Sequence, residues 1–117
     1  MLFPSKRNKV LQYLEQKKEA GLSAFDDLLR DWAAGDMKER LREMGLTGVE
    51  IHLDWLEDYQ CLGIQGKYQQ NYVDLQIEPR QVLFAYDPVE PDEPECLPLE
   101  SKEQVYALLN ERLNARA

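Results

Sequence analysis

The stretch that decides the fold is Val49-Glu50-Ile51-His52-Leu53-Asp54-Trp55. Apolar and polar residues alternate strictly along it. Successive side chains of a β-strand point to opposite faces of a sheet, so this pattern buries one face and exposes the other to water. The stretch therefore predicts a β-strand in an antiparallel sheet that has one buried and one polar face.

Three further runs with strand-like composition follow, at residues 62–68, 73–77 and 82–86. The third strand shows its two faces clearly, with Val73, Leu75 and Ile77 on one and Tyr72, Asp74 and Gln76 on the other. The run 82–86 is apolar on both faces, so the sequence leaves open which of them is buried. The expected turns are Glu57-Asp58, Gln70-Asn71 and Pro79-Arg80. Because these connections are too short for helical crossovers, residues 49–87 are predicted to form a four-stranded antiparallel meander.

Helices are predicted on both sides of the meander. Residues 5 to about 19 form a Lys-rich helix with a thin apolar stripe, which we expect at the periphery of the domain. Ser23, with Asp26 three residues later, predicts the start of a helix with a strong apolar stripe. Gly35 breaks this pattern, and the sequence leaves open whether the following piece continues the same helix through a kink. Asp36 is expected to cap a third helix, and Ser101 with Gln104 predicts the start of the last one. We expect the stripes to cover the apolar sheet face and to place Trp32 and Trp55 in the core. The prediction is one α+β domain over residues 1–117, with the helices mainly on one face of the sheet.

Charge limits the classes of partner. The chain has 117 residues and a formal net charge of −8. An acidic chain is repelled by nucleic acid and by anionic lipid, so the charge disfavours both partners. Residues 1–20 hold five basic residues against two acidic ones, a local balance of +3, which leaves nucleic-acid binding through that segment as a third hypothesis. The stretch 87–100 contains four prolines and six acidic residues without a basic one, and it is predicted to be an extended acidic loop.

The sequence offers no targeting signal and no motif for a cofactor. No apolar run approaches the roughly 20 residues that span a bilayer, and residues 1–7 lack a signal-peptide core, so we expect a cytoplasmic protein. Cys61 and Cys96 fit no metal-binding spacing and are expected to be free thiols. No cofactor is predicted.

One cluster has metal-ligand or acid–base chemistry, namely Glu50, His52 and Asp54 on the polar face of the first strand. Alternate strand residues lie about 6–7 Å apart, whereas metal ligands converge at about 2 Å. The three residues could share an ion only if the strand bends or another residue contributes. His52 is the only histidine, so a two-histidine site cannot form within one chain.

The leading hypothesis is a small, acidic, non-catalytic module that binds a basic protein, of the antitoxin, immunity-protein, chaperone or adaptor type. Its contact residues would lie on the acidic loop and the polar sheet face: Asp87, Glu90, Asp92, Glu93, Glu95, Tyr72 and Asp74. The alternative is a small enzyme or metal-binding protein that uses Glu50, His52 and Asp54. The sequence does not indicate an oligomeric state.

Overall fold

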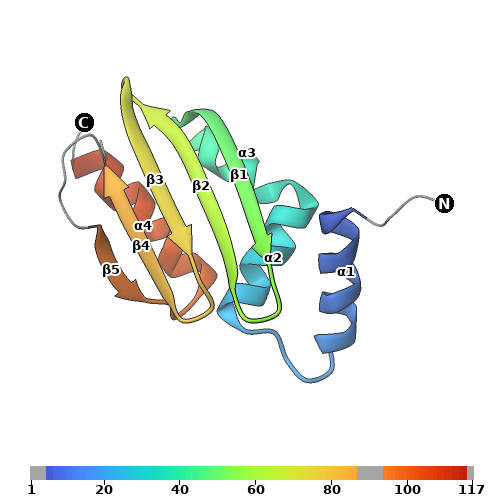
Figure 1. Ribbon diagram of the computed structural model, residues 1–117. Coiled ribbons are helices and arrows are strands. Elements are labelled where there is room, and N and C mark those ends of the chain that lie inside the picture. The colour runs from blue at the N-terminus through green and yellow to red at the C-terminus, as the bar shows by residue number, and fades with distance from the viewer. Residues whose placement is uncertain (1–4, 87–93, 116–117) are drawn as a thin grey trace.

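The computed structural model describes residues 5–86 and 94–115 of the chain (Figure 1). Three helices come first, then a β-sheet, then a last helix. In order, the elements are α1 (Lys6–Lys17), α2 (Ala24–Ala34), α3 (Asp36–Glu43), β1 (Thr47–Trp55), β2 (Gln60–Tyr68), β3 (Asn71–Ile77), β4 (Gln81–Tyr86), β5 (Glu95–Pro98) and α4 (Lys102–Ala115). The α+β class predicted from the sequence is confirmed. Among the described residues, no helix has both the length and the apolar character needed to cross a bilayer.

The described strands form one antiparallel sheet in the order β1-β2-β3-β4-β5, so the predicted meander is present but has five strands and not four. The additional strand, β5, lies within the stretch that was predicted to be a loop. It pairs only with β4 and ends at Pro98. An edge strand tolerates proline because one side of its backbone needs no ladder partner, and this is why the proline content misled the sequence-based prediction.

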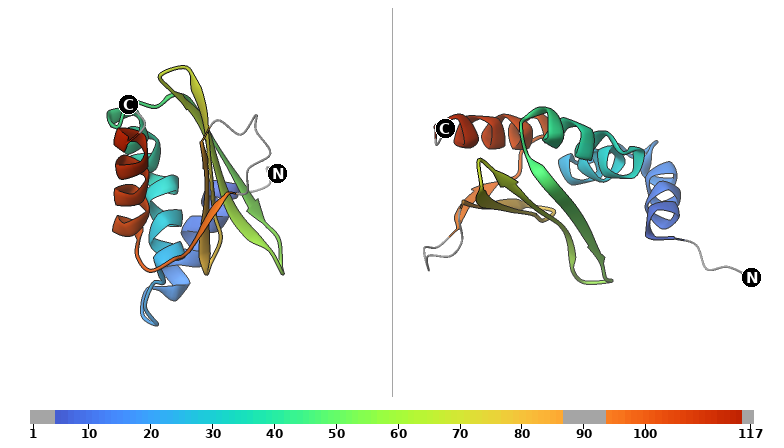
Figure 2. Two further views of the ribbon diagram at one scale, coloured as in Figure 1. Left: turned by 90° about the vertical axis from the view of Figure 1, so that its left-hand side faces the viewer. Right: turned by 90° about the horizontal axis from the view of Figure 1, so that it is seen from above.

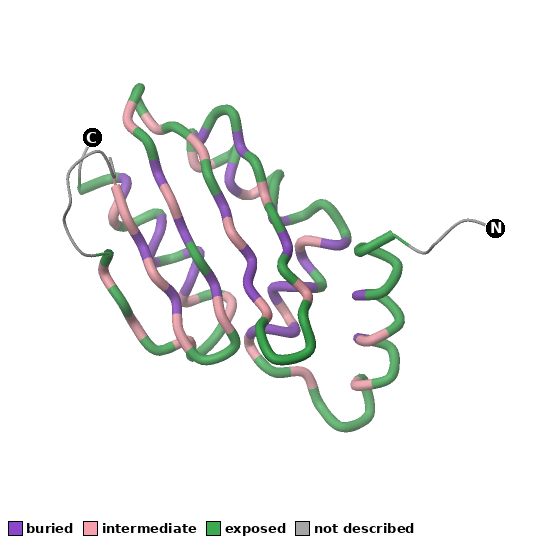
Figure 3. The backbone as a smooth tube through the Cα atoms, in the orientation of Figure 1, coloured by how far each residue is buried: buried purple, intermediate pink, exposed green. Residues whose placement is uncertain are grey.

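The sheet has one face packed against helices, and buried and exposed positions alternate along its longer strands (Figure 3). Figure 2 shows α2, α3 and α4 in one layer over that face, with α1 beside the β1 edge. Val82 and Phe84 are buried there, which settles the face of β4 that the sequence left open. The core lies between the layers and includes Leu28, Leu29, Leu62, Leu75, Ile77 and Leu109. Trp32 and Trp55 are only half-buried at its margin, so the prediction that both are core residues was too strong.

Helix α1 is attached to the rest of the fold. Val10 and Leu14 of its apolar stripe are buried. Buried Asp26 accepts hydrogen bonds from the Tyr13 hydroxyl and the Lys17 ammonium, and it also accepts one from the backbone N–H of Ser23. These bonds lower the pKa of Asp26 against the opposing effect of burial. Asp26 therefore both caps α2 and holds α1 against it.

The predicted helix starts at Ser23 and Ser101 are confirmed by reciprocal capping hydrogen bonds with Asp26 and Gln104. The predicted cap at Asp36 is wrong. Gly35 occupies the capping position with φ +85°, so no side-chain hydrogen bond caps the start of α3. Left-handed backbone is inexpensive for glycine, so Gly35 separates α2 from α3.

Candidate functional site

The sheet face opposite the helices is uncovered by any described element (Figure 2). Alternate strand residues point to it because the residues between them point into the core. We call this surface the open sheet face. Its side chains include Glu50, His52 and Asp54 of β1, Gln65 and Lys67 of β2, Tyr72, Asp74 and Gln76 of β3, Leu83 and Ala85 of β4, and Cys96 of β5.

The strand register brings together acidic residues from different strands. Glu50 is paired with Gln65, which in turn is paired with Asp74. Neighbouring strands lie about 4.8 Å apart, so the backbones at Glu50 and Asp74 are about 10 Å apart in one row. Three carboxylates, those of Glu50, Asp54 and Asp74, are thus on the open sheet face.

Asp74 is the unusual residue of the open sheet face. It lies on the middle strand β3, is half-buried, and has no hydrogen-bond or ion-pair partner within residues 5–86 and 94–115. Burial raises the pKa of the Asp74 carboxyl above its ordinary value, and no hydrogen bond or positive charge from the described residues lowers it again. A partly desolvated carboxylate without a partner is a position at which an added positive charge would be favourable.

The neighbouring Tyr72 also faces outward. It lies close to the β2–β3 turn and is 51% exposed, so its ring is accessible. The Lys67 ammonium lies 5.0 Å from the centre of its ring. Aromatic rings at exposed positions are preferred contact residues in protein interfaces. Tyr72 and Asp74, the two predicted contact residues on the sheet, therefore lie on the same face with their side chains accessible.

The proposed metal ligands do not form a ligand set. His52 Nε2 lies 3.7 Å from Glu50 Oε2, and both side chains are largely exposed. Within the described residues, no group of three or more histidine, cysteine, aspartate or glutamate side chains could hold a metal ion. Asp54, two residues further along β1, does not complete the pair, in keeping with the extended spacing of a strand.

The structure describes only part of the acidic stretch. Asp87, Glu90, Asp92 and Glu93 lie outside the described residues. Glu95 lies in β5, and its two carboxylate oxygens accept hydrogen bonds at 2.9 and 2.6 Å from Arg112 of α4. This paired geometry raises the pKa of the Arg112 guanidinium. Glu95 thus holds β5 against α4, a role that the sequence-based prediction of a partner contact missed.

Basic residues of α1 are used within the chain. Lys6 donates to the backbone carbonyl of Leu53, Arg7 donates to that of Ala33, and Lys17 pairs with Asp26. Of these three contacts, only the Lys17–Asp26 pair offsets a positive charge, because the carbonyl acceptors of Lys6 and Arg7 are neutral. The hypothesis of nucleic-acid binding through this segment gains no support from these contacts.

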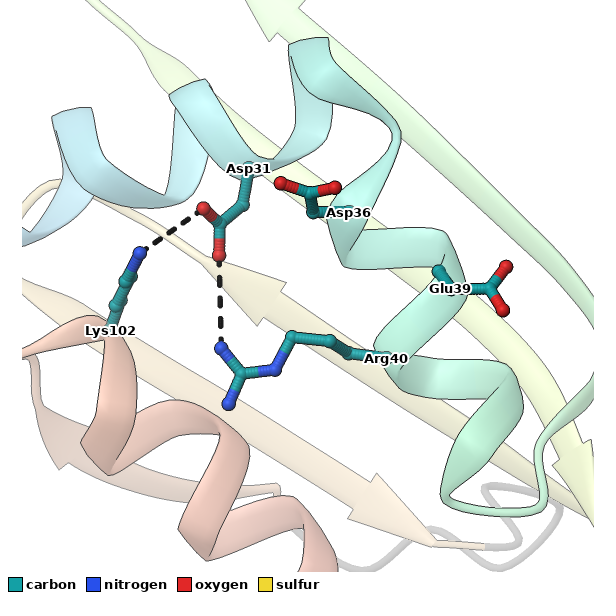
Figure 4. A pocket seen from close by; sticks show the side chains of 5 residues that line it. All are labelled: Asp31, Asp36, Glu39, Arg40 and Lys102. Atoms are coloured by element: carbon teal, nitrogen blue, oxygen red, sulfur yellow. Dashed lines mark hydrogen bonds and ion pairs between the residues drawn. The ribbon is translucent and has the colours of Figure 1, made fainter.

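A hollow of about 240 Å³ between α2, α3 and α4 contains the second charged cluster (Figure 4). Buried Asp31 accepts hydrogen bonds from Lys102 at 3.2 Å and from the Tyr106 hydroxyl at 3.0 Å, and Arg40 approaches it to 4.0 Å. Arg40 also stacks 3.7 Å above the Tyr106 ring. Tyr106 is buried, and burial together with Asp31 raises the pKa of its hydroxyl.

The buried charge of this hollow, that of Asp31, is compensated by Lys102 and Arg40, which indicates a structural role. Asp31 and Lys102 are 71 residues apart, so sequence reasoning did not find the pair. One feature of the sequence could have indicated the pair: Asp31 lies three residues after Leu28, on the apolar side of α2. A charge on that side requires a buried partner.

Comparisons with known proteins add no family. No protein-family model matches the chain, and no match was found among the curated proteins or the solved structures. Function is therefore argued from the open sheet face itself.

Proposed function

We propose that the chain is a small non-catalytic module that binds a basic protein on the open sheet face. The observation that carries the proposal is Asp74, a partly desolvated carboxylate without a partner among the described residues, in the middle of a sheet face that no described element covers. A lysine or arginine of the partner would pair with this carboxylate and lower its pKa. Tyr72 beside it would supply aromatic contact area.

Charge complementarity supports a basic partner. Glu50, Asp54 and Asp74 share the open sheet face, and the whole chain carries a net charge of −8. Complementary charges steer two proteins together and raise the association rate. Salt should slow this association, because the screening length is about 10 Å at 0.1 M ionic strength. In this proposal the module acts in the cytoplasm as an antitoxin, immunity protein, chaperone or adaptor.

The test compares two variants with the same change in charge. Glu50→Gln/Asp54→Asn/Asp74→Asn removes three carboxylates from the open sheet face. Asp36→Asn/Glu39→Gln/Glu43→Gln removes three exposed carboxylates from α3, on the helical side. Wild type and both variants are immobilised and exposed to native lysate at low salt. Retained proteins are eluted with a salt gradient and identified by mass spectrometry.

The expected result is a basic protein that wild type and the α3 variant retain, that the open-face variant loses, and that elutes as the salt concentration rises. The purified partner should then associate at least 10-fold more slowly with the open-face variant than with the α3 variant. Equal retention by the two variants would show that the open sheet face is not the binding surface. Failure of wild type to retain any basic protein would overturn the proposal as a whole.

A further inference from the structure

A groove runs along the free edge of the sheet. It has a volume of about 400 Å³ and lies between β1 and the junction of α2 with α3. Its apolar lining comes from Trp32, Val49 and Ile51, while Gly35 and Lys38 form the helical rim. Trp32 and Ile51 are only half-buried although they contact the core. The groove is the reason why Trp32, which belongs to the apolar stripe of α2, is not fully covered.

Among the described strands, none lies on the outer side of the β1 backbone beside this groove. β1 is the first strand of the sheet, and its partner in the described structure is β2. In an antiparallel ladder alternate residues direct their N–H and C=O groups to the same side. The Leu53 carbonyl points outward, since it accepts a hydrogen bond from Lys6 of α1. Ile51, two residues earlier, shares this orientation, and no described group hydrogen-bonds to its outward side.

An edge with outward-pointing backbone groups next to an apolar groove is the arrangement that accepts an added strand. The backbone of an incoming segment would pair with Ile51. Its side chains would alternate between the groove on the helical side and the open sheet face on the other. Residues that flank the pairing position would lie beside Glu50 and His52. The chemistry on the two sides of β1 therefore selects a segment that alternates apolar and basic residues.

We propose that an extended segment of the basic partner adds to β1 as an antiparallel strand, with an apolar side chain in the groove and basic side chains beside Glu50. This inference rests on the proposed function and specifies how the partner engages the sheet. A second copy of the chain is the poorer occupant, because both copies carry a net charge of −8. Helix α1 also occupies the Leu53 end of the edge, which shortens the strand that a second copy could pair.

The probe is the peptide acetyl-Lys-Val-Lys-Leu-Lys-Val-Lys-amide with a fluorescent label, and binding is measured by anisotropy at low salt. In antiparallel pairing the peptide residue opposite Ile51 exchanges backbone hydrogen bonds with it, and that residue is an apolar one. N-methylation of the three apolar residues should therefore weaken binding at least 10-fold. N-methylation of the lysines between them should change it less than threefold. Equal affinities of the two methylated peptides would overturn strand addition.

Two protein variants separate the groove from general charge effects. Ile51→Lys places a cation at the groove and should weaken binding of the peptide at least 10-fold. Leu56→Lys is the matched control, because it adds the same charge at an exposed apolar residue just after β1. Amide spectra should place the largest peptide-induced shifts at residues 49–52 and at the Trp32 indole. Equal effects of the two variants would refute the role of the groove.

The outcomes distinguish this inference from the proposed function. If peptide binding is lost in Glu50→Gln/Asp54→Asn/Asp74→Asn but is unchanged in Ile51→Lys, the open sheet face remains the binding surface and strand addition is refuted. No binding of the peptide by wild type at low salt would also refute strand addition, while the lysate experiment would still decide the proposed function. A stable dimer in sedimentation that Ile51→Lys dissociates would assign the edge to a second copy and overturn the choice of partner.

Discussion

Replacement of Asp31 by alanine should destabilise the fold by about 2–3 kcal/mol. The Tyr106 hydroxyl hydrogen bond, at 3.0 Å and buried, contributes about 1 kcal/mol. The Lys102 hydrogen bond is charge-assisted and would contribute about 1.5–3 kcal/mol in a buried site. The lower end of that range applies because the Lys102 side chain is 25% exposed. Arg40 adds little at 4.0 Å, since it reaches solvent and also pairs with Glu103.

This loss is a large share of the roughly 5–15 kcal/mol that stabilises a domain. Urea unfolding followed by circular dichroism measures it. The matched control is Asp27→Ala on the same helix, where the carboxylate pairs only with nearby Arg30 at the surface. Its cost should stay below about 1 kcal/mol. Both variants gain the same helix propensity from alanine, so the difference between them isolates the buried cluster.

A double-mutant cycle tests the mechanism directly. Tyr106→Phe removes only the hydroxyl that donates to Asp31. If the two residues act together, the double variant should lose less stability than the sum of the single losses by about 0.5 kcal/mol or more. Strict additivity, or an Asp31→Ala loss no larger than that of Asp27→Ala, would refute the assignment of Asp31 as the charged link between α2 and α4.

Three further results are expected. Asp74→Asn should raise the free energy of unfolding at neutral pH. The pKa of Asp74 is raised in the folded state, so the folded protein binds this proton more tightly than the unfolded chain. The stabilising contribution of Asp74 is therefore fully present below its ordinary pKa of 3.8, and it is lost as the pH rises through the pKa of the folded state. Urea melts at pH 3 and pH 7 should show the gain only at pH 7, and a loss at pH 7 would contradict the unpaired state. Thiol reagents should label exposed Cys96 rapidly and buried Cys61 only on unfolding, because burial raises the pKa of the Cys61 thiol. The two residues are separated by three strand spacings, which is at least about 14 Å, and this is too far for a disulfide. An intact mass lower by two hydrogens would contradict this geometry. Gln70→Gly should stabilise the fold by about 0.5–1 kcal/mol in the same melts, because Gln69 and Gln70 have φ of +50° and +74° in a two-residue hairpin turn that favours glycine at its second position, and an unchanged midpoint would count against this strain.

Part of the candidate site could be predicted from the sequence. Alternation placed Tyr72 and Asp74 together on one face of a strand, and the structure leaves that face open. It also put Glu50 and His52 on the same side, where the structure shows them within 3.7 Å. Alternation could not show that Asp74 is desolvated without a described partner, because its surroundings come from other strands. The groove at the β1 edge was equally hidden, since Trp32 and Ile51 belong to different layers.

The sequence by itself determined the features that depend on neighbours along the chain. Ser23 with Asp26, and Ser101 with Gln104, specify helix starts because a capping hydrogen bond spans only three residues. The period-two pattern of residues 49–55 specified a strand and its buried face. One local prediction was still displaced by a residue, since the turn expected at Gln70-Asn71 lies at Gln69–Gln70 once Tyr68 pairs with Asn71.

Tertiary structure alone decided the features that join distant residues. Residues 95–98 become a strand only because β4 offers them an edge, and Arg112 of α4 holds Glu95 there. Asp31 is tolerated inside an apolar arc because α4 brings Lys102 and Tyr106 to it. A local pattern records whether a side chain is to be buried, but the partner that makes burial of a charge or pairing of a strand favourable is set by the packing of the whole chain.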